Sequence, residues 1–399
     1  MTAKPELETQ NSEYVKDGAE RLKKEAPERA PCSEGERRCA DFLLNELKPY
    51  SDEVTEELVF AHPAGRPVIY KAVCIMLILS AVLFKISEIL GTAGFAAAAS
   101  PLSLAAFALF AHKFFFDGTA VDRIFPKKRS QNIIFKRYPR AATLTRVVIT
   151  ADLDMPQYTR TFGKGKNTAY LLTVCCIICN TLIFCCCNAY LLCGAPENSA
   201  VFSALSALCV LLSVFYIAAL LLYKTKPPRV SGDRGADMCM TLAAIMKQLS
   251  QTGFRYANTE LCIMFTGAGG ASHAGAYTFA EKHRRTCRDV PTVFISLEDI
   301  SDTSELALYF KDTDSGSSEA ASILAEAAES IDLKAEKESS LFGTPAHVPF
   351  ASRRFAACSV GTTKKHGDIP DGRPFSPDAV YDLAYILTQA VNYYDNLQR

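Results

Sequence analysis

The sequence predicts an α/β fold in which a mostly parallel mixed sheet is sandwiched by helices and interrupted by two transmembrane helical hairpins. Two observations predict it. After residue 238, short apolar runs of strand length alternate with stretches of helical periodicity, a pattern typical of a sheet with helices on both faces. Before that point, charged residues are nearly absent from four windows of about 20 residues, the length that crosses the hydrocarbon core of a bilayer.

The composition excludes some classes of partner. The 399 residues can form one large core or two modest ones. The 43 basic and 43 acidic residues leave no net charge, so we expect no nucleic-acid partner. Of the 15 cysteines, seven lie between Cys175 and Cys193 in an apolar segment, where we expect small buried hydrophobes. The others lack paired or metal-finger spacing, as expected in a reducing compartment.

The N-terminal region has a soluble character. Residues 1–30 are polar and charged, so no signal peptide is predicted. Ala19–Leu47 is predicted to be largely helical, with Ser33 opening its second half. Val54–Phe60 follows as an edge strand.

Four apolar segments form the two predicted hairpins. The first hairpin pairs Val68–Leu90 with Gly94–Phe116, and the second pairs Thr168–Cys193 with Val201–Tyr223. Basic residues flank each pair on the side away from its turn, and both turns lack Lys and Arg. The positive-inside rule therefore predicts a multi-pass protein of the cell membrane with cytoplasmic soluble segments.

The remaining elements surround one glycine-rich loop. The predicted strands are Asn132–Phe135, Thr145–Thr150, Glu260–Phe265, Thr292–Leu297, Leu306–Phe310 and Ala356–Val360, and the predicted helices are Met238–Gln251, Gly275–Arg284, Ser317–Ile331 and Pro377–Asn396. The loop from Thr266 to Gly270 lies at the carboxyl end of a strand, where ligands bind in open α/β sheets. It offers no side chain able to perform chemistry. Its Gly267-x-Gly269 spacing imitates a dinucleotide loop but fails at Ser272, where a third glycine is needed.

Five blocks of the sequence occur in an order that resembles a known family. They are Gly35–Leu43, Val147–Asp154, Leu261–Gly270, Val293–Asp299 and His366. Together they resemble the cocatalytic zinc exopeptidases, more narrowly peptidase family M-twenty-eight, and within it a membrane-embedded bacterial branch. The resemblance implies a zinc-exopeptidase-like fold for nearly all of the soluble segments.

The resemblance also implies positions for metal ligands. In that family two zinc ions share a bridging carboxylate and a bridging water. Asp152 stands where the family has a histidine ligand, and Asp154 matches the aspartate that orients this ligand. Glu298 replaces an aspartate ligand, and His366 matches the terminal histidine ligand. Asp233 is available for the bridging aspartate, although the simplest register places an arginine, a permanent cation, in that position.

The catalytic position is degenerate. The family's Glu-Glu pair, a general base followed by a ligand, aligns with Gly269-Gly270, so no catalytic residue is assigned. Losing a general base costs about two to four powers of ten in rate. Two interpretations of the other positions stay open. In the first, a single ion is held by Asp152, Asp233, Glu298 and His366. In the second, these residues bind no metal: the aspartates at 152 and 154 cap the loop, Glu298 pairs with a local cation and His366 is a surface histidine.

We therefore predict a membrane-anchored zinc-aminopeptidase-like protein that is catalytically inactive and acts as a binding or scaffolding module for a peptide terminus or a partner protein. The resemblance allows zinc, but no resident cofactor is expected. The alternative is an active metal-dependent aminopeptidase with a non-standard ligand set. The peptidase-like domain is divided into residues 1–67, 117–167 and 224–399 by hairpins at 68–116 and 168–223.

Two charged features have more than one interpretation. Late in the first span, Lys85 and Glu88 form either an ion pair near the membrane interface or a polar site within the membrane. Two charged residues are too few to form the polar path of a transporter. Lys127–Arg129, together with Lys136, Arg137 and Arg140, contact anionic lipid headgroups or only set the topology.

Overall fold

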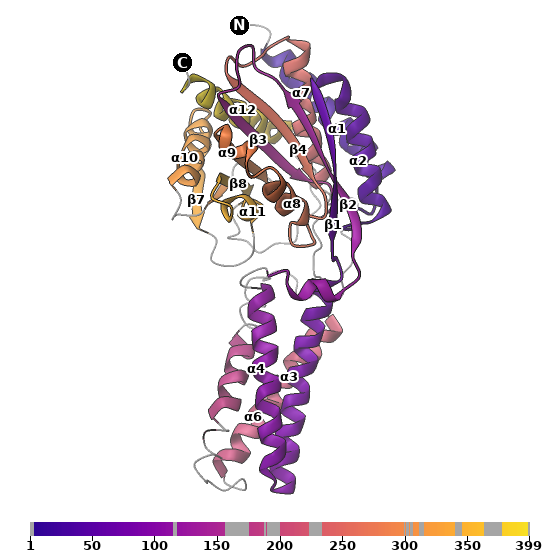
Figure 1. Cartoon of the computed structure of the whole chain (residues 1–399), viewed down its shortest axis with the longest axis vertical. Coiled ribbons are helices and arrows are strands. Elements are labelled where there is room, and N and C mark those ends of the chain that lie inside the picture. Colours follow the sequence, from indigo (N-terminus) through magenta and orange to yellow (C-terminus); the bar gives the residue numbers. More distant parts are fainter. Residues whose placement is uncertain are drawn as a thin grey trace.

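The computed structural model has two parts, an α/β domain and a bundle of long apolar helices (Figure 1). It describes residues 4–114, 118–155, 175–186, 189, 200–222, 234–298, 300, 303, 306–310, 315–339, 345–362 and 377–397.

The α/β domain is built on an eight-stranded sheet of order β1-β2-β4-β3-β5-β8-β6-β7. The strands are β1 Glu53–Ala61, β2 Lys128–Arg137, β3 Thr145–Asp152, β4 Thr259–Thr266, β5 Thr292–Leu297, β6 Leu306–Phe310, β7 Ala335–Ser339 and β8 Ala356–Thr362. Four of the seven pairings are parallel, and three, β1 with β2, β2 with β4 and β6 with β8, are antiparallel. The predicted mostly parallel mixed sheet is confirmed. Strand β7 was not predicted, because its charged side chains at the edge of the sheet give no apolar signal.

Helices cover both faces of this sheet. One face packs against α1 Lys4–Glu25, α2 Glu34–Leu47, α7 Arg234–Gln251, α10 Ser315–Glu329 and α12 Pro377–Asn396, and the other against α8 Ala274–Lys282, α9 Thr286–Asp289 and α11 Val348–Ala351. Consecutive residues of β3 point to opposite faces of the sheet: Val147 packs against the helices of the first face and Val148 against those of the second. This explains the unbroken apolar runs of the central strands.

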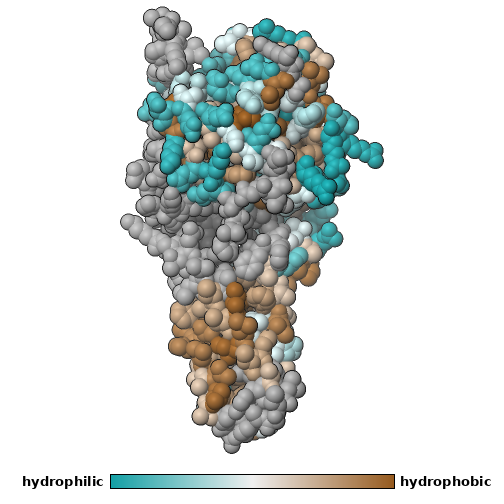
Figure 2. All heavy atoms as spheres, turned by 90° about the vertical axis from the view of Figure 1, so that its left-hand side faces the viewer, coloured by the Kyte–Doolittle hydropathy of each residue, from teal (hydrophilic) through white to brown (hydrophobic). Residues whose placement is uncertain are grey.

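Three helices are long and apolar enough to cross a membrane: α3 Gly65–Leu90, α4 Ala93–Phe114 and α6 Ala200–Leu222. Helices α3 and α4 form the first predicted hairpin, and Figure 2 shows apolar side chains over the surface of this bundle. Of the predicted span 168–193, the described part is the shorter apolar helix Cys175–Cys186 and residue 189, so a complete second hairpin is not seen.

Two expectations about the bundle need refinement. The described cysteines form no disulfide, and Cys175, Cys179, Cys185 and Cys186 are exposed on the outside of the bundle. The expectation that the cysteines of this segment are buried is therefore wrong for these four. Lys85 and Glu88 form an ion pair at 2.8 Å, and Ser203 Oγ on α6 donates to Glu88 at 2.6 Å. The pair is therefore satisfied within the bundle.

The direction of the strands places the carboxyl edge of the sheet next to the bundle. Strand β1 ends at Ala61, shortly before α3 begins at Gly65. Strand β2 runs antiparallel to β1, and β4 antiparallel to β2, so β4 runs toward the bundle together with its parallel neighbours β3 and β5. The edge where ligands bind in such sheets therefore faces the apolar helices (Figure 1).

Candidate functional site

The loop between β4 and α8 lies at this carboxyl edge and is held by buried side chains from other elements. Asn132 on β2 closes its two ends: Oδ1 accepts from the N–H of Gly267 at 3.1 Å, and Nδ2 donates to the carbonyl of Gly275 at 3.0 Å. The amide of Asn132 is fully buried, so both bonds are made away from water. These contacts across the sheet add to the loop's own backbone bonds, such as that from the N–H of Gly275 to the carbonyl of Gly267 at 3.0 Å.

Two carboxylates accept the successive N–H groups of this loop. Glu36, in the first turn of α2, accepts from Ala268 through Oε1 and from Cys32 at 2.6 Å through Oε2. Asp154, just after β3, accepts from Gly269 through Oδ1 and from Gly270 through Oδ2, both at 2.7 Å. Because protein carboxylates already take these donors, the loop does not offer them to a phosphate, and the dinucleotide-loop interpretation loses its physical basis.

Burial and mutual repulsion perturb this carboxyl cluster. Burial raises the pKa of Asp154 well above its ordinary value, the carboxylates of Asp152 and Glu36 raise it further, and the N–H bonds from Gly270 and Gly269 offset only part of this. Burial also raises the pKa of Glu36 against the bonds from Ala268 and Cys32. The cluster therefore favours keeping a proton at a pH where isolated carboxyl groups lose theirs.

Asp152 fills the space beside Gly269. A Cβ atom on Gly269 would lie 2.3 Å from both Cγ and Oδ2 of Asp152. Thr266 Oγ1 donates to Asp152 Oδ1 at 2.5 Å, which holds the short carboxylate in this place. The backbone of Gly269 is not in the left-handed region, so glycine is needed here for space and not for its conformation. The position where the resemblance in sequence puts a general base is therefore closed to a side chain unless Asp152 moves.

Three non-glycine residues of the loop adopt left-handed backbone conformations. Their φ angles are 55° at Ala268, 59° at Ser272 and 50° at His273. Such residues cost about 1–3 kcal/mol each and cluster at functional sites, where the surrounding contacts over-determine them. The three strained residues make this loop a candidate functional site.

A second polar group lies beside the loop at the carboxyl ends of β3, β5 and β8. Thr150, Ser296 and Ser359 are paired in register across these strands, and Thr150 Oγ1 donates to Ser296 Oγ at 3.0 Å. All three are buried. The sequence analysis missed this row, although a hydroxyl residue near the end of each apolar run was a readable signal.

His347 extends this row and was also missed. It is 2% exposed, its backbone N–H donates to Ser359 Oγ at 3.0 Å, and its Nδ1 lies 2.9 Å from the same oxygen. Since Ser359 Oγ already accepts the backbone N–H, the Ser359 hydroxyl donates its own proton to Nδ1, and the ring proton of the neutral imidazole lies on Nε2. Burial, and to a smaller extent the nearby His273, lower the pKa of His347 to about 4, so the imidazole is neutral near pH 7. No motif surrounds His347, so no signal in the sequence singles it out.

The predicted metal ligands are only partly brought together. Asp152 ends β3 and Glu298 follows the neighbouring strand β5, but Glu298 Oε1 accepts from the N–H of Ala346 at 2.9 Å. Asp233 and His366 lie outside the described residues. Among the residues that are described, no group of three or more His, Cys, Asp or Glu side chains could hold a metal ion. The carboxylates of Asp152 and Glu298 accept hydrogen bonds from hydroxyl and N–H groups, and these two described candidate ligands do not fit a two-zinc centre.

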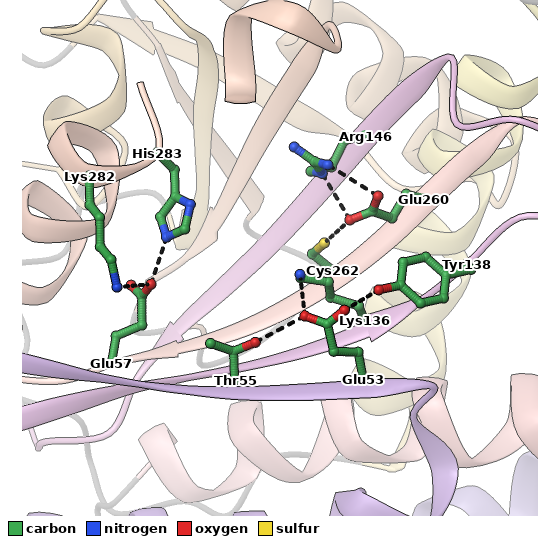
Figure 3. A network of polar contacts seen from close by, with 10 residues as sticks. All are labelled: Glu53, Thr55, Glu57, Lys136, Tyr138, Arg146, Glu260, Cys262, Lys282 and His283. Carbon is green, nitrogen blue, oxygen red and sulfur yellow. Dashed lines mark hydrogen bonds and ion pairs between the residues drawn. The ribbon is translucent and has the colours of Figure 1, made fainter. Parts of the chain in front are cut away.

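A further network holds α8, which carries the loop at its start. Glu57 on β1 is 3% exposed and accepts from Lys282 Nζ at 2.8 Å and from His283 Nε2 at 2.6 Å (Figure 3). Burial alone would raise the pKa of Glu57, but the bonds from His283 and Lys282 hold it below its ordinary value. The other pairs in Figure 3, such as Arg146 with Glu260 at 2.9 Å, link neighbouring strands. These contacts position the helix and carry no chemistry of their own.

The loop also touches the apolar bundle. Lys113, in the last turn of α4, forms a buried ion pair with Asp122 in the short helix η2 Val121–Ile124. Its Nζ also donates to Ser272 Oγ at 2.8 Å. One side of the candidate site is therefore fixed to the end of a helix able to cross a membrane.

The sheet order, the helical layers and the site at the carboxyl edge define a protein with the zinc-exopeptidase fold. Similar solved structures include a Zn-dependent exopeptidase from Parabacteroides distasonis, with a TM-score of 0.52 and 11% identity over 96% of this chain and 97% of that chain. A zinc aminopeptidase from Bacillus subtilis gives 0.52 and 11% over 96% and 95%. A glutaminyl cyclase from Porphyromonas gingivalis gives 0.51 and 12% over 96% and 98%.

At these identities the likeness shows the fold alone, and it confirms the zinc-exopeptidase-like architecture that the sequence predicts. No protein-family model matches the chain, and no curated protein matches it in sequence.

Proposed function

We propose that this chain is a membrane-anchored protein of the zinc-exopeptidase fold that does not perform aminopeptidase chemistry and acts as a binding or scaffolding module. One observation carries the proposal: the carboxylate of Asp152 occupies the space beside Gly269, where the resemblance puts the general base. A base needs a carboxylate that can reach a water and take its proton. The neighbouring carboxylates of Glu36 and Asp154 are bound to loop N–H groups instead.

The fold does not fix one reaction. Its similar solved structures are named as exopeptidases, an aminopeptidase and glutaminyl cyclases, so activity must be argued from the site. The site retains a strained, tightly bonded loop and a buried polar row but lacks a fitting set of metal donors among the described residues. A rigidly held loop whose described carboxylates are bound to N–H and hydroxyl groups supports recognition of a peptide terminus or partner protein.

The membrane arrangement belongs to the same proposal. We infer four spans in two hairpins, inserted into a peptidase-like domain made of residues 1–67, 117–167 and 224–399, with the domain in the cytoplasm. The three described apolar helices support the anchoring. Because the carboxyl edge of the sheet faces the bundle, a ligand of this site is met close to the membrane surface.

The rival function is an active metal-dependent aminopeptidase with an altered ligand set. The close approach of Asp152 to Gly269 also favours this rival, because it puts a carboxylate near the position where the resemblance places the general base. In that case Asp152, which the resemblance puts among the ligands, would instead take the proton, and Asp233, Glu298 and His366 would remain as ligands.

The two functions are separated by zinc analysis of the purified full-length protein together with hydrolysis of aminoacyl amides by the wild type and by Asp152→Asn. The proposal expects far less than one zinc ion per chain and no turnover that a chelator removes. It also expects the two proteins to behave alike. About two zinc ions per chain, with chelator-sensitive turnover that Asp152→Asn abolishes, would overturn it and establish the rival.

A further inference from the structure

The segment from Val121 to Arg129 lies at the boundary between the α/β domain and the bundle. Asp122 pairs with Lys113 at the end of α4. A Cβ on Gly65, the first residue of α3, would lie 2.2 Å from Asp122 Oδ1. His62 Nδ1 is 2.7 Å from the carbonyl oxygen of Phe125. These contacts hold the segment against the domain-side ends of both apolar helices.

This segment is strongly basic and exposed. Arg123, Lys127, Lys128 and Arg129, here called the basic collar, are all exposed to solvent. The one acidic residue of the segment, Asp122, is buried and neutralised by Lys113. The collar therefore presents a local positive field although the whole chain has no net charge.

Apolar side chains are exposed beside the same charges. Ile124 is 80% exposed, in the middle of the collar. Phe60 is 42% exposed, and Lys127 Nζ lies 4.0 Å from the centre of its ring. Cations beside exposed apolar groups at the end of a membrane-length helix are typical of a segment that lies in the headgroup region.

The other basic residues grouped with this segment by the sequence do not belong to the collar. Arg137 is 7% exposed and donates to the carbonyls of Tyr50, Leu249 and Phe254, and Lys136 pairs with Glu53 at 2.6 Å. Strand β2 begins at the bundle and runs away from it, so Arg140 beyond its end lies far from the helix ends. Lys136, Arg137 and Arg140 therefore lie toward the end of β2 that points away from the bundle, and we leave them out of the collar.

We propose that the basic collar binds the headgroups of anionic phospholipids in the leaflet that the α/β domain faces, with Ile124 inserted among them. The inference rests on the membrane anchoring of the proposed function. Four cations within seven residues complement an anionic leaflet, and insertion removes the exposed isoleucine from water. The bound lipid would also lie next to the Lys113–Asp122 pair that supports the site.

The test uses the absence of tryptophan from the chain. Ile124→Trp gives a single indole reporter in the full-length protein, which is reconstituted in nanodiscs of equal phosphatidylcholine and phosphatidylglycerol. Either lipid is brominated near the headgroup end of its acyl chains. We expect brominated phosphatidylglycerol to quench at least about twofold more strongly than brominated phosphatidylcholine. Adding Lys127→Gln, Lys128→Gln and Arg129→Gln should make the two lipids quench equally.

Two control reporters separate this inference from the anchoring. Leu211→Trp, at a residue 60% exposed on α6, should be quenched equally by both lipids, and Leu144→Trp, 43% exposed at the opposite end of the sheet, by neither. Equal quenching at position 124 with normal quenching at 211, or selectivity that survives the three glutamine substitutions, overturns the collar alone. An unquenched reporter at 211 overturns the anchoring and the collar with it.

Discussion

Lys113 Nζ lies 2.8 Å from the hydroxyl oxygen of Ser272 and is only 1% exposed. One residue ends an apolar helix and the other is in the loop at the carboxyl edge of the sheet. The same ammonium pairs with Asp122, so a single buried cation joins the bundle, the boundary segment and the loop. A displacement of α4 therefore acts directly on the candidate site.

Lys113→Met should destabilise the protein by about 3–5 kcal/mol, because it leaves the buried Asp122 carboxylate without a cation. Hydrogen exchange should also become faster at the amides of residues 266–275. Both are measured on the full-length protein in nanodiscs. Lys113→Met combined with Asp122→Asn should restore much of the stability but not the slow exchange of the loop. Equal exchange in all three proteins would show that the bond to Ser272 does not hold the loop.

Gly269→Glu should destabilise the protein by about 1–3 kcal/mol, because the new side chain overlaps the carboxylate of Asp152. Adding Asp152→Gly should recover most of this loss by vacating the space. Denaturant unfolding provides the measurement. Gly94→Ala is the matched control, since no heavy atom lies within 4 Å of its Cβ position. A Gly269→Glu protein as stable as the wild type would mean that Asp152 does not close this position.

Acidification should weaken the fold through His347. Its pKa falls from 6.5 to about 4 in the folded protein, so the unfolded chain binds more protons between these values. Stability from this residue is complete above pH 6.5 and is lost as the pH falls toward 4, by about 3 kcal/mol in total. Urea unfolding at pH 7 and pH 5 measures the slope. His347→Asn keeps an acceptor for Ser359 and should remove this part of the slope; an unchanged slope would assign it to other groups.

Asn132→Leu should loosen the loop from both ends. The substitution removes the partners of two buried backbone groups, the Gly267 N–H and the Gly275 carbonyl, at about 1–3 kcal/mol each. The exposed Asn45→Leu is the control and should change stability by less than about 0.5 kcal/mol. Thermal unfolding distinguishes the two. A loss no larger than that of the control would mean that the loop keeps its shape without Asn132.

Much of the fold was predictable because its signals are local. The predicted strand Thr292–Leu297 coincides with β5. A short run of apolar residues is buried on both sides when it forms a central strand of a sheet covered by helices on both faces. Helices α3 and α4 followed from the length and apolarity of their segments. Strand β7 was not predicted, because Glu336, Lys337 and Glu338 are charged and form a strand only through their backbone pairing with β6. Hydropathy does not reveal such pairing.

The amino-acid sequence by itself determined the alternating layers, the apolar helices and the missing side chains at Gly269 and Gly270, because each depends on a residue and its near neighbours. Only the tertiary structure decided what fills that space and what holds the loop. Asp154 and Glu36 reach it from 115 and 232 residues away, and Lys113 reaches Ser272 across 159. Such contacts depend on strand order and register, which bring distant carboxylates and N–H groups within hydrogen-bonding distance and which no local pattern encodes.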